Sequence, residues 1–265
     1  MTTLAHISDL HFGREDPRLI DGMMHSLEKI QPQLVVISGD LTQRARQREF
    51  KAARAFLDSL PWPHLVIAGN HDIPAYNFAE RFFTPWKKWR RYLGYPLEPI
   101  VSGSGYIAIG INTARRSGTL IDWSRGRVSP EQISVMAGHL DKCEDEKLRV
   151  IVAHHPFWLP EDYRHRHTIG GRDMALSAMR KTGVDIILSG HVHFAYTRLL
   201  DGLIISHAGT AVSNRLNVNN RNSFKIVRGN RRKLAIETWE WGNTSFSIAK
   251  ERFFNRTRGE WMDDA

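Results

Sequence analysis

The sequence lacks the features expected of secreted and membrane-spanning proteins. Cys143 is its only cysteine, so the chain can form no internal disulfide bond. We therefore expect the protein in a reducing cellular compartment. No apolar run approaches the roughly 18 residues that a membrane-spanning helix requires. The first residues enter an apolar segment with no basic region before a long apolar stretch, so no secretory signal is expected. We therefore expect a cytoplasmic protein without a transmembrane segment.

The shortage of cysteine also excludes a metal site built from several thiolates. Any bound metal must be held by His, Asp, Asn or Glu side chains, and the sequence contains 13 histidines. A set of nitrogen and oxygen ligands favours Mn, Fe, Co, Ni or Zn without selecting one of them.

The charge is unbalanced, with 37 basic against 28 acidic residues and a formal net charge of +9. A positive field attracts nucleic acid, anionic lipid or a small anionic substrate, and composition does not choose among these. The basic residues gather in segments 81–92, 164–167 and 225–233 rather than in a low-complexity arm. They are therefore expected on a folded surface.

Apolar runs alternate with segments of helical period up to about residue 190, which predicts an α/β domain. Helices are expected over 17–30 and 46–60, and another should begin at Ser129-Pro130. After Gly190 the pattern changes to short strands, expected over 196–200, 203–207, 223–227 and 233–239. We expect one domain over residues 1–241, followed by an extension over 242–265 whose structure the sequence leaves open.

Five polar clusters each follow an apolar run of β type, where a buried strand of an α/β sheet would end. Ligands collect at the carboxyl ends of such strands. A single Asp-x-His is more often a surface pair than a metal site, but all five clusters together predict a metal-dependent hydrolase. The clusters are Asp9-Leu10-His11, Gly39-Asp40, Gly69-Asn70-His71-Asp72, His154-His155-Pro156 and Gly190-His191-Val192-His193.

The residue types in these clusters suit two neighbouring metal ions. Asp40 follows a glycine that lets the backbone approach closely, and its two carboxylate oxygens are suited to bridging two ions. Asn70 supplies a neutral amide oxygen, and the histidines supply imidazole nitrogens. Two ions about 4 Å apart can lower the pKa of a shared water and stabilise displacement at phosphorus.

The clusters resemble the signature of the calcineurin-like metallophosphoesterases, from residue 9 to residue 193, with no ligand position missing. The stretch from Ala208-Gly209-Thr210-Ala211 to Asn222-Ser223-Phe224 is also similar to the tail of the bacterial cyclic-nucleotide phosphodiesterase branch. The resemblance implies a four-layer α/β/β/α sandwich of two mixed sheets, with two ions of Mn, Fe or Zn. It implies one metal on Asp9, His11, Asp40 and His193, and a second on Asp40, Asn70, His154 and His191.

The resemblance also implies a role for His71 outside the metal ligands. His71, oriented by Asp72, would hydrogen-bond the phosphate or protonate the leaving oxygen, which suits an imidazole near neutral pH. Of the adjacent pair, the family's His-x-Pro pattern favours His154 as the ligand. His155 would then support a ligand or form a wall of the pocket.

Four residues are candidates for contact with substrate. Arg164 and Arg166 follow the His154 strand by about ten residues, and their loop could overhang the metal site and grip a second phosphate. A solvated loop explains the same residues equally well. His207 ends a strand and could line the pocket, although an ordinary structural histidine is the more common case there. His155 is the fourth candidate.

Segment 81–93 has an amphipathic pattern. Trp86, Trp89 and Leu93 would share one helical face, and Lys87, Lys88 and Arg91 another. The favoured prediction is that the tryptophans pack inward and the basic face is solvated. The alternatives are docking on an anionic membrane or a lid over the metal site.

The sequence thus favours an enzyme that hydrolyses a phosphodiester, such as a cyclic nucleotide or another small diester, by attack of a metal-bridging hydroxide. The alternative is a lipid- or nucleotide-linked pyrophosphatase at a membrane surface. A nuclease would fit the positive net charge. It is less favoured because the sequence contains no aromatic motif of the kind that binds nucleic-acid strands. A scaffold that has lost catalysis, like a retromer subunit of the same superfamily, is disfavoured because every predicted ligand and His71 are present.

Overall fold

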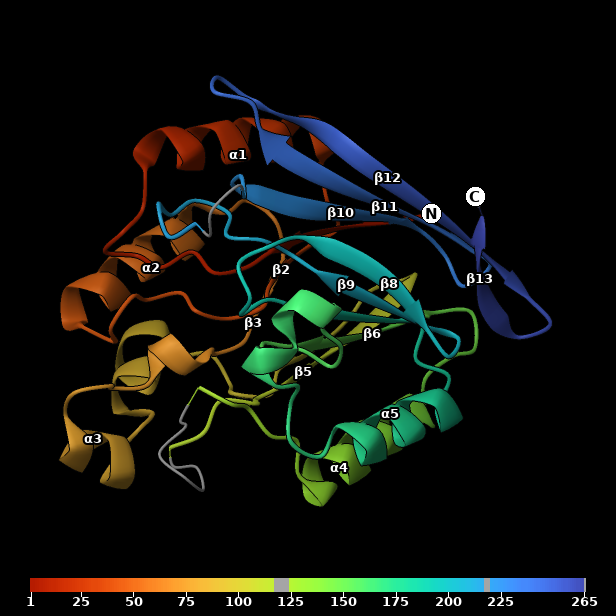
Figure 1. Cartoon of the computed structure of the whole chain (residues 1–265), viewed down its shortest axis with the longest axis horizontal. Coiled ribbons are helices and arrows are strands. Elements are labelled where there is room, and N and C mark those ends of the chain that lie inside the picture. The colour runs from red at the N-terminus through yellow and green to blue at the C-terminus, as the bar shows by residue number, and fades with distance from the viewer. Residues whose placement is uncertain (117–123, 217–219, 265) are drawn as a thin grey trace.

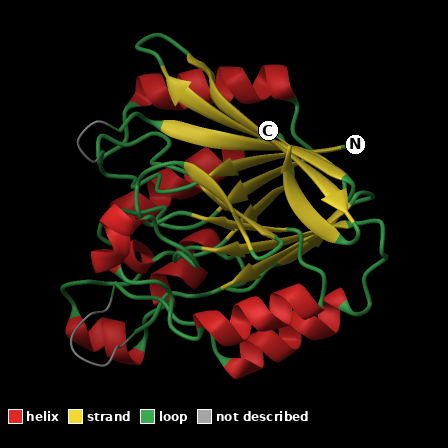
Figure 2. Ribbon diagram, turned by 45° about the vertical axis from the view of Figure 1, so that its right-hand side comes forward, coloured by secondary structure: helices red, strands yellow, loops and turns green. Residues whose placement is uncertain are grey.

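Two β-sheets pack face to face in a computed structural model that describes residues 1–116, 124–216 and 220–264. Helices cover the outer face of each sheet, as Figures 1 and 2 show from two directions. The layers therefore follow the order α/β/β/α, which confirms the predicted sandwich.

The first sheet has seven strands in the order β13-β12-β11-β10-β1-β2-β3. β1, β2 and β3 run parallel, and β10 lies antiparallel to β1 and begins the meander that ends with β13. The bounds are β1 Thr2–Ile7, β2 Leu34–Ile37, β3 His64–Val66, β10 Ser223–Gly229, β11 Lys233–Trp241, β12 Phe246–Thr257 and β13 Glu260–Asp264.

The second sheet has six strands in the order β4-β5-β6-β7-β9-β8. β5, β6, β7 and β9 run parallel, and an antiparallel strand lies at each edge. The bounds are β4 Ile100–Ser102, β5 Tyr106–Ile111, β6 Leu148–Ala153, β7 Ile186–Ser189, β8 Tyr196–Leu200 and β9 Leu203–His207.

Side-chain caps mark the start of two of the long helices. Asp16 accepts a hydrogen bond from the Arg18 amide at 3.0 Å before the first long helix, and Ser129 does the same for the Gln132 amide at 3.2 Å. The helices are α1 Pro17–Ile30, α2 Gln47–Ser59, α3 Phe78–Phe83, α4 Pro130–Leu140 and α5 Arg172–Lys181, with short turns η1 Asn70–Asp72, η2 Trp89–Leu93 and η4 Glu161–Arg166.

Alternation along the strands explains why the apolar runs are continuous. Leu34 and Val36 of β2 enter the core between the sheets, whereas Val35 and Ile37 enter the core beneath α1 and α2. Successive side chains of a strand point to opposite faces, so a strand that is covered on both faces must be apolar throughout. β6 and β7 follow the same rule with α4 and α5 on their outer side.

The segment after residue 241, which the sequence left open, adds β12 and β13 to the first sheet. Asp185, just before β7 of the second sheet, links these strands to the other half of the sandwich. Its buried carboxylate accepts hydrogen bonds from Arg256 at 2.6 Å and from the Trp261 indole at 3.2 Å. Arg231 lies 3.1 Å from its second oxygen. β12 and β13 therefore pair within the first sheet and are also hydrogen-bonded, through Asp185, to the second sheet.

Replacing Asp185 with alanine is expected to lower the free energy of unfolding by about 3 kcal/mol, because it leaves largely buried guanidinium and indole groups without their acceptor. Guanidinium chloride unfolding would measure the loss. Asp201→Ala is the control, since Asp201 forms an exposed pair with Arg180 at 3.4 Å that should contribute less than about 1 kcal/mol. Equal effects of the two substitutions would contradict the proposed link.

The amphipathic segment confirms the prediction of inward packing. Trp89 and Leu93 are buried against the core beneath α1 and α2, and the Trp89 indole donates a hydrogen bond to the Tyr95 carbonyl at 2.8 Å. Trp86 packs partly against the same core. The last turn widens into the π-helix η2 rather than continuing as an α-helix. Across the described part of the chain, no helix has the length and apolar character needed to cross a membrane.

Candidate metal centre

The predicted ligands meet where strands of both sheets end. Asp9 and His11 follow β1, Asp40 follows β2, and Asn70 opens η1 after β3. From the second sheet, the residues that follow β6 and β7 arrive at the same place. These are His154, His191 and His193.

One group of potential ligand atoms lies within 4.8 Å of one another and belongs to Asp9, His11, Asp40 and His193. Asp9 Oδ1 lies 3.3 Å from His193 Nε2 and 3.7 Å from His11 Nε2. His11 Nε2 lies 3.8 Å from Asp40 Oδ2 and only 3.2 Å from His193 Nε2. Two carboxylates and two imidazole nitrogens thus face one small volume.

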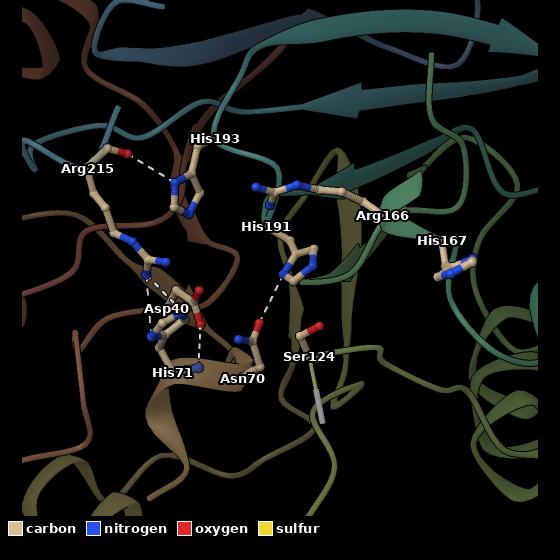
Figure 3. Close-up of a pocket in the computed structure, with 9 residues that line it drawn as sticks. All are labelled: Asp40, Asn70, His71, Ser124, Arg166, His167, His191, His193 and Arg215. Atoms are coloured by element: carbon tan, nitrogen blue, oxygen red, sulfur yellow. Dashed lines mark hydrogen bonds between the residues drawn. The ribbon is translucent and has the colours of Figure 1, made fainter. Parts of the chain in front are cut away.

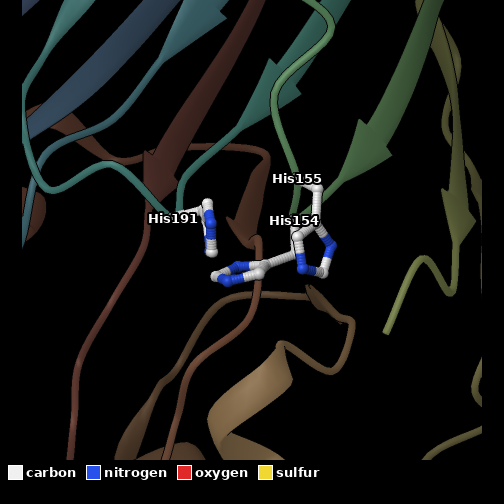
Figure 4. A group of neighbouring side chains, drawn as sticks. All are labelled: His154, His155 and His191. Carbon is white, nitrogen blue, oxygen red and sulfur yellow. The ribbon is translucent and has the colours of Figure 1, made fainter. Parts of the chain in front are cut away.

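A second group lies on the other side of Asp40. His154 Nε2 lies 3.3 Å from Asp40 Oδ2 and 3.2 Å from Asn70 Oδ1. His191 Nδ1 lies 2.9 Å from the same Asn70 oxygen. Asp40 therefore stands between the two groups, as a bridging carboxylate would. His155 is close enough to join His154 and His191 as a third potential ligand, as Figure 4 shows.

Backbone carbonyl groups orient the imidazoles. A histidine that binds a metal usually donates its other ring N–H to a carbonyl or carboxylate, which fixes the tautomer. In three of the four predicted histidine ligands, Nδ1 faces such a carbonyl and leaves Nε2 for the centre. The distances are 3.4 Å from His11 to Thr42 O, 2.8 Å from His154 to Ser38 O and 3.0 Å from His193 to Arg215 O.

The backbone around the centre is held in an uncommon conformation. Five of the eleven described non-glycine residues with positive φ are predicted ligands, and such strain gathers at functional sites. They are Asp9 (54°), His11 (48°), Asp40 (52°), His191 (75°) and His193 (61°). Two glycines allow the loops to close: a Cβ on Gly69 would lie 2.1 Å from Asp40 Oδ1, and one on Gly190 would lie 1.9 Å from Ser8 Oγ.

The electrostatics of the centre favour a cation. Burial lowers the pKa of His154, but Asp40 outweighs this effect and raises it to about 9. Burial raises the pKa of Asp40, yet His154 and His71 hold it well below its usual range. An environment that attracts a proton to His154 Nε2 attracts a metal ion to the same lone pair. Asp9 Oδ1 is buried without a hydrogen-bond partner, which also fits a metal ligand.

Burial is the largest influence on the pKa of two other imidazoles, and the nearby carboxylates do not offset it. It lowers the pKa of His11 to about 3 and that of His191 to about 3, so both rings are neutral near pH 7. A neutral ring has a free lone pair, and no proton must leave before a metal binds. The donor set therefore fits two metal ions.

The structure corrects the expected role of Asp72. Its carboxylate does not contact the His71 ring but accepts hydrogen bonds from the amides of Thr42 at 2.8 Å and Gly69 at 2.9 Å. Asp72 thus holds the loop after β2 against the loop after β3. The His71 ring is instead oriented by the Gln43 carbonyl, 2.8 Å from Nδ1. The carboxylate of Asp72 lies close to loop amides that need an acceptor, so it binds them and not the neighbouring imidazole.

A cavity of about 300 Å³ opens over the centre. Figure 3 shows Asp40, Asn70 and His71 on one side of it, with Arg166 and Arg215 reaching in from other loops. Arg215 was not among the predicted site residues, although it lies in the stretch that resembles the cyclic-nucleotide phosphodiesterase tail. Its Nη1 lies 2.8 Å from His71 Nε2. Arg215 belongs to no motif in the sequence that would mark it as a site residue. Only the folded structure brings it next to His71.

The other predicted substrate contacts are placed as follows. Arg166 lines the cavity, whereas the side chain of Arg164 lies outside the described part of the structure. His155 is buried, with Nδ1 2.7 Å from Thr113 Oγ1, and is not among the residues that line the cavity. His207, for which a structural role was the more common expectation, is not brought to the cavity: it is fully buried in β9 and stacks on Tyr196 at 4.3 Å between ring centroids.

Comparison with known proteins agrees with this geometry. A family model described as calcineurin-like phosphoesterase matches residues 2–195. The chain is 36% identical over 81 residues to a glycerophosphodiester phosphodiesterase from Enterobacter lignolyticus, covering 26% of this chain and 29% of that protein. It is 25% identical over 185 residues to a probable glycerophosphodiester phosphodiesterase from Arcobacter nitrofigilis, covering 69% and 64%. The matched regions thus span less than two thirds of either relative.

A longer match is found with a probable cyclic nucleotide phosphodiesterase from Synechococcus, 26% identical over 206 residues and covering 73% of this chain and 74% of that protein. Among solved structures, a dimetal phosphatase from Danio rerio superimposes with a TM-score of 0.69 at 11% identity, covering 97% of this chain and 99% of that chain. That likeness concerns the fold.

Proposed function

Because the chain belongs to the calcineurin-like phosphoesterase family, we propose that it hydrolyses a phosphodiester at a centre of two metal ions. The observation that carries the proposal is the position of Asp40. Its Oδ2 lies 3.8 Å from His11 Nε2 in one ligand group and 3.3 Å from His154 Nε2 in the other. A single carboxylate placed in this way serves both metals.

The proposed metals are held by Asp9, His11, Asp40 and His193 on one side and by Asp40, Asn70, His154 and His191 on the other. When bound, they supply Lewis-acid stabilisation of the phosphoryl oxygens and lower the pKa of a coordinated water.

The groups around the centre complete the proposed chemistry. Gln43 fixes the His71 ring through Nδ1, and Nε2, at the wall of the cavity, accepts a hydrogen bond from Arg215 Nη1 at 2.8 Å. When Arg215 turns to the substrate phosphate, Nε2 becomes free to carry a proton. A proton at that atom can pass to the departing oxygen of the ester. Arg215 presents its guanidinium group to the phosphate of the ester, and Arg166 can hold a second anionic group of the substrate, because such forks bind phosphate through paired hydrogen bonds.

The size of the cavity and the matched relatives point to a small diester as substrate. A volume of about 300 Å³ suits a small molecule rather than a folded polymer. Relatives named as glycerophosphodiester and cyclic nucleotide phosphodiesterases support the same class. We propose a cyclic nucleotide or an alkyl phosphodiester as the substrate.

Hydrolysis of bis(p-nitrophenyl) phosphate, measured beside p-nitrophenyl phosphate with added Mn²⁺ and again with chelator, tests the proposal. The expected result is turnover that favours the diester and disappears with chelator. Absence of turnover on either ester, while two metal ions are bound, would contradict the proposal. It would direct attention to a lipid- or nucleotide-linked pyrophosphate.

Replacing Arg166 with alanine is expected to raise KM about tenfold for a diester that carries a second anionic group, because one charge-assisted hydrogen bond is lost. The KM for a diester with a neutral tail should stay unchanged, and kcat should change little. Arg18→Ala is the control, since Arg18 pairs with Asp16 at 2.8 Å on the exposed start of α1. An equal rise in KM on both substrates would exclude recognition of the second charge.

A further inference from the structure

A second surface outside the metal centre combines exposed aromatic and basic side chains. It lies between the end of α3 and the turn η2, where Figure 1 shows α3 at the periphery of the molecule. A groove of about 790 Å³ runs through it. We call it the basic aromatic surface and define it by six lining residues: Phe83, Trp86, Lys87, Arg90, Arg91 and Arg116.

The apolar part of this surface is not the one that the helical pattern predicts. Trp89 and Leu93 are buried, whereas Phe83 exposes 84% of its surface to solvent. The preceding Phe82 is 39% exposed. Two neighbouring exposed phenyl rings beside a groove form an apolar patch. Such patches mark interaction sites more often than isolated exposed apolar residues do.

The charge of this surface has one sign. Lys87, Arg90, Arg91 and Arg116 are exposed, and among the residues that the structure describes none that lines the groove is acidic. The nearby Glu80 is already engaged, because Lys88 donates a hydrogen bond to its carboxylate at 2.9 Å. Four cations without a lining acid produce a local positive field that attracts an anionic partner.

The fold holds the aromatic and basic parts together. The guanidinium of Arg81, on α3, donates hydrogen bonds to the carbonyls of Pro74, Arg115 and Arg116 at 3.1, 3.1 and 3.0 Å. The buried indole of Trp89 anchors the basic turn from below. The partner therefore meets a preformed surface.

We propose that the basic aromatic surface docks the protein on an anionic lipid bilayer. Arginine and lysine side chains attract the phosphates of anionic lipids near the bilayer surface. Phe83 can bury its ring at the boundary between headgroups and acyl chains, as aromatic residues of interfacial segments do. A single-stranded nucleic acid could satisfy the charges and stack a base on one ring, whereas a bilayer accommodates the neighbouring exposed rings of Phe82 and Phe83 together.

Flotation of the full chain with lipid vesicles tests the proposal. Vesicles of phosphatidylcholine with about 30% phosphatidylglycerol should bind the protein at about 0.1 M salt, and raising the salt to about 0.5 M should release it. Vesicles of phosphatidylcholine alone should not bind it. Failure to bind the anionic vesicles would overturn the proposal. Binding of a single-stranded oligonucleotide without binding of vesicles would identify a nucleic-acid surface instead.

Variants assign the binding to this surface. The triple substitution Lys87→Ala, Arg90→Ala and Arg91→Ala should reduce vesicle partitioning at least about tenfold, and Phe83→Ser alone should reduce it several-fold. Hydrolysis of bis(p-nitrophenyl) phosphate should be unchanged in both, which shows that they are folded.

A matched control removes the same charge elsewhere. Lys29, Lys51 and Lys181 are exposed on α1, α2 and α5, and their replacement by alanine should leave vesicle binding almost intact. Equal losses in this control and in the triple variant would show that only net charge matters. That result would overturn the assignment to the basic aromatic surface.

Discussion

Replacement of Asp40 by asparagine is expected to lower kcat for bis(p-nitrophenyl) phosphate by at least about a thousandfold. Asp40 lies between the two ligand groups, with Oδ2 3.3 Å from His154 Nε2 and 3.8 Å from His11 Nε2. Asparagine has nearly the same shape, but its amide oxygen carries no negative charge, so it bridges two cations far more weakly than the Asp40 carboxylate oxygen does. A metal pair supplies several kcal/mol of transition-state stabilisation, and each 1.36 kcal/mol corresponds to a factor of ten.

Two measurements separate this effect from a folding defect. The metal content should fall from two ions per chain to one or fewer. Added Mn²⁺ should raise the melting temperature of the parent protein more than that of Asp40→Asn, since a ligand stabilises the state that binds it. Asp16→Asn, at the exposed cap of α1, is the control and should retain turnover. A rate within tenfold of the parent for Asp40→Asn would contradict a shared bridging carboxylate.

Replacement of His71 by glutamine is expected to lower kcat by about 10²- to 10⁴-fold on a dialkyl phosphodiester, the usual contribution of a general acid. The His71 ring lies beside the centre, 5.0 Å from the His11 ring between centroids, and is oriented by Gln43 rather than by a metal. An alkoxide needs a proton in order to leave, whereas p-nitrophenolate is a stable anion. The loss on bis(p-nitrophenyl) phosphate should therefore be much smaller.

The contrast between the two substrates identifies the role of His71. Equal losses on both would indicate that His71 binds the phosphate or positions Arg215, whose Nη1 lies 2.8 Å from its Nε2. Metal content should be unchanged in His71→Gln, because His71 is not among the proposed ligands. His139→Gln, on the exposed face of α4, is the matched control and should leave both activities intact.

Local sequence patterns predicted the central elements because those elements are specified locally. The helix over 17–30 has a cap, a proline at its first turn and one apolar face, and the structure has α1 over the same residues. The strands beneath the helices had to be apolar at every position, as in 34–37. The strands β12 and β13 were not predicted, because β12 is mostly exposed and its stability comes from pairing with β11.

The residues of the site also fall into those that local sequence predicted correctly and those whose position depends on tertiary contacts. The predicted ligands follow directly from strand ends, and the parallel strands of two sheets bring them together. Asp72 was assigned to His71 because the two are adjacent in sequence, yet loop amides of Thr42 and Gly69 hold its carboxylate. His207 ends a strand like the ligands do, but its side chain stacks on Tyr196 of the neighbouring strand instead of reaching the cavity. Which way a side chain points at a strand end depends on what covers each face.

The sequence by itself determined the chemistry available to this protein: a single cysteine, seven candidate nitrogen and oxygen ligands placed after apolar runs, and a positive charge. Only the tertiary structure decided which groups act together. It set Asp40 between two groups of ligands, brought Arg215 to His71 and turned Trp89 inward while leaving Phe83 exposed. The physical reason is that ligand types and strand patterns are local properties of the chain. Contacts between loops more than a hundred residues apart arise only when the two sheets pack.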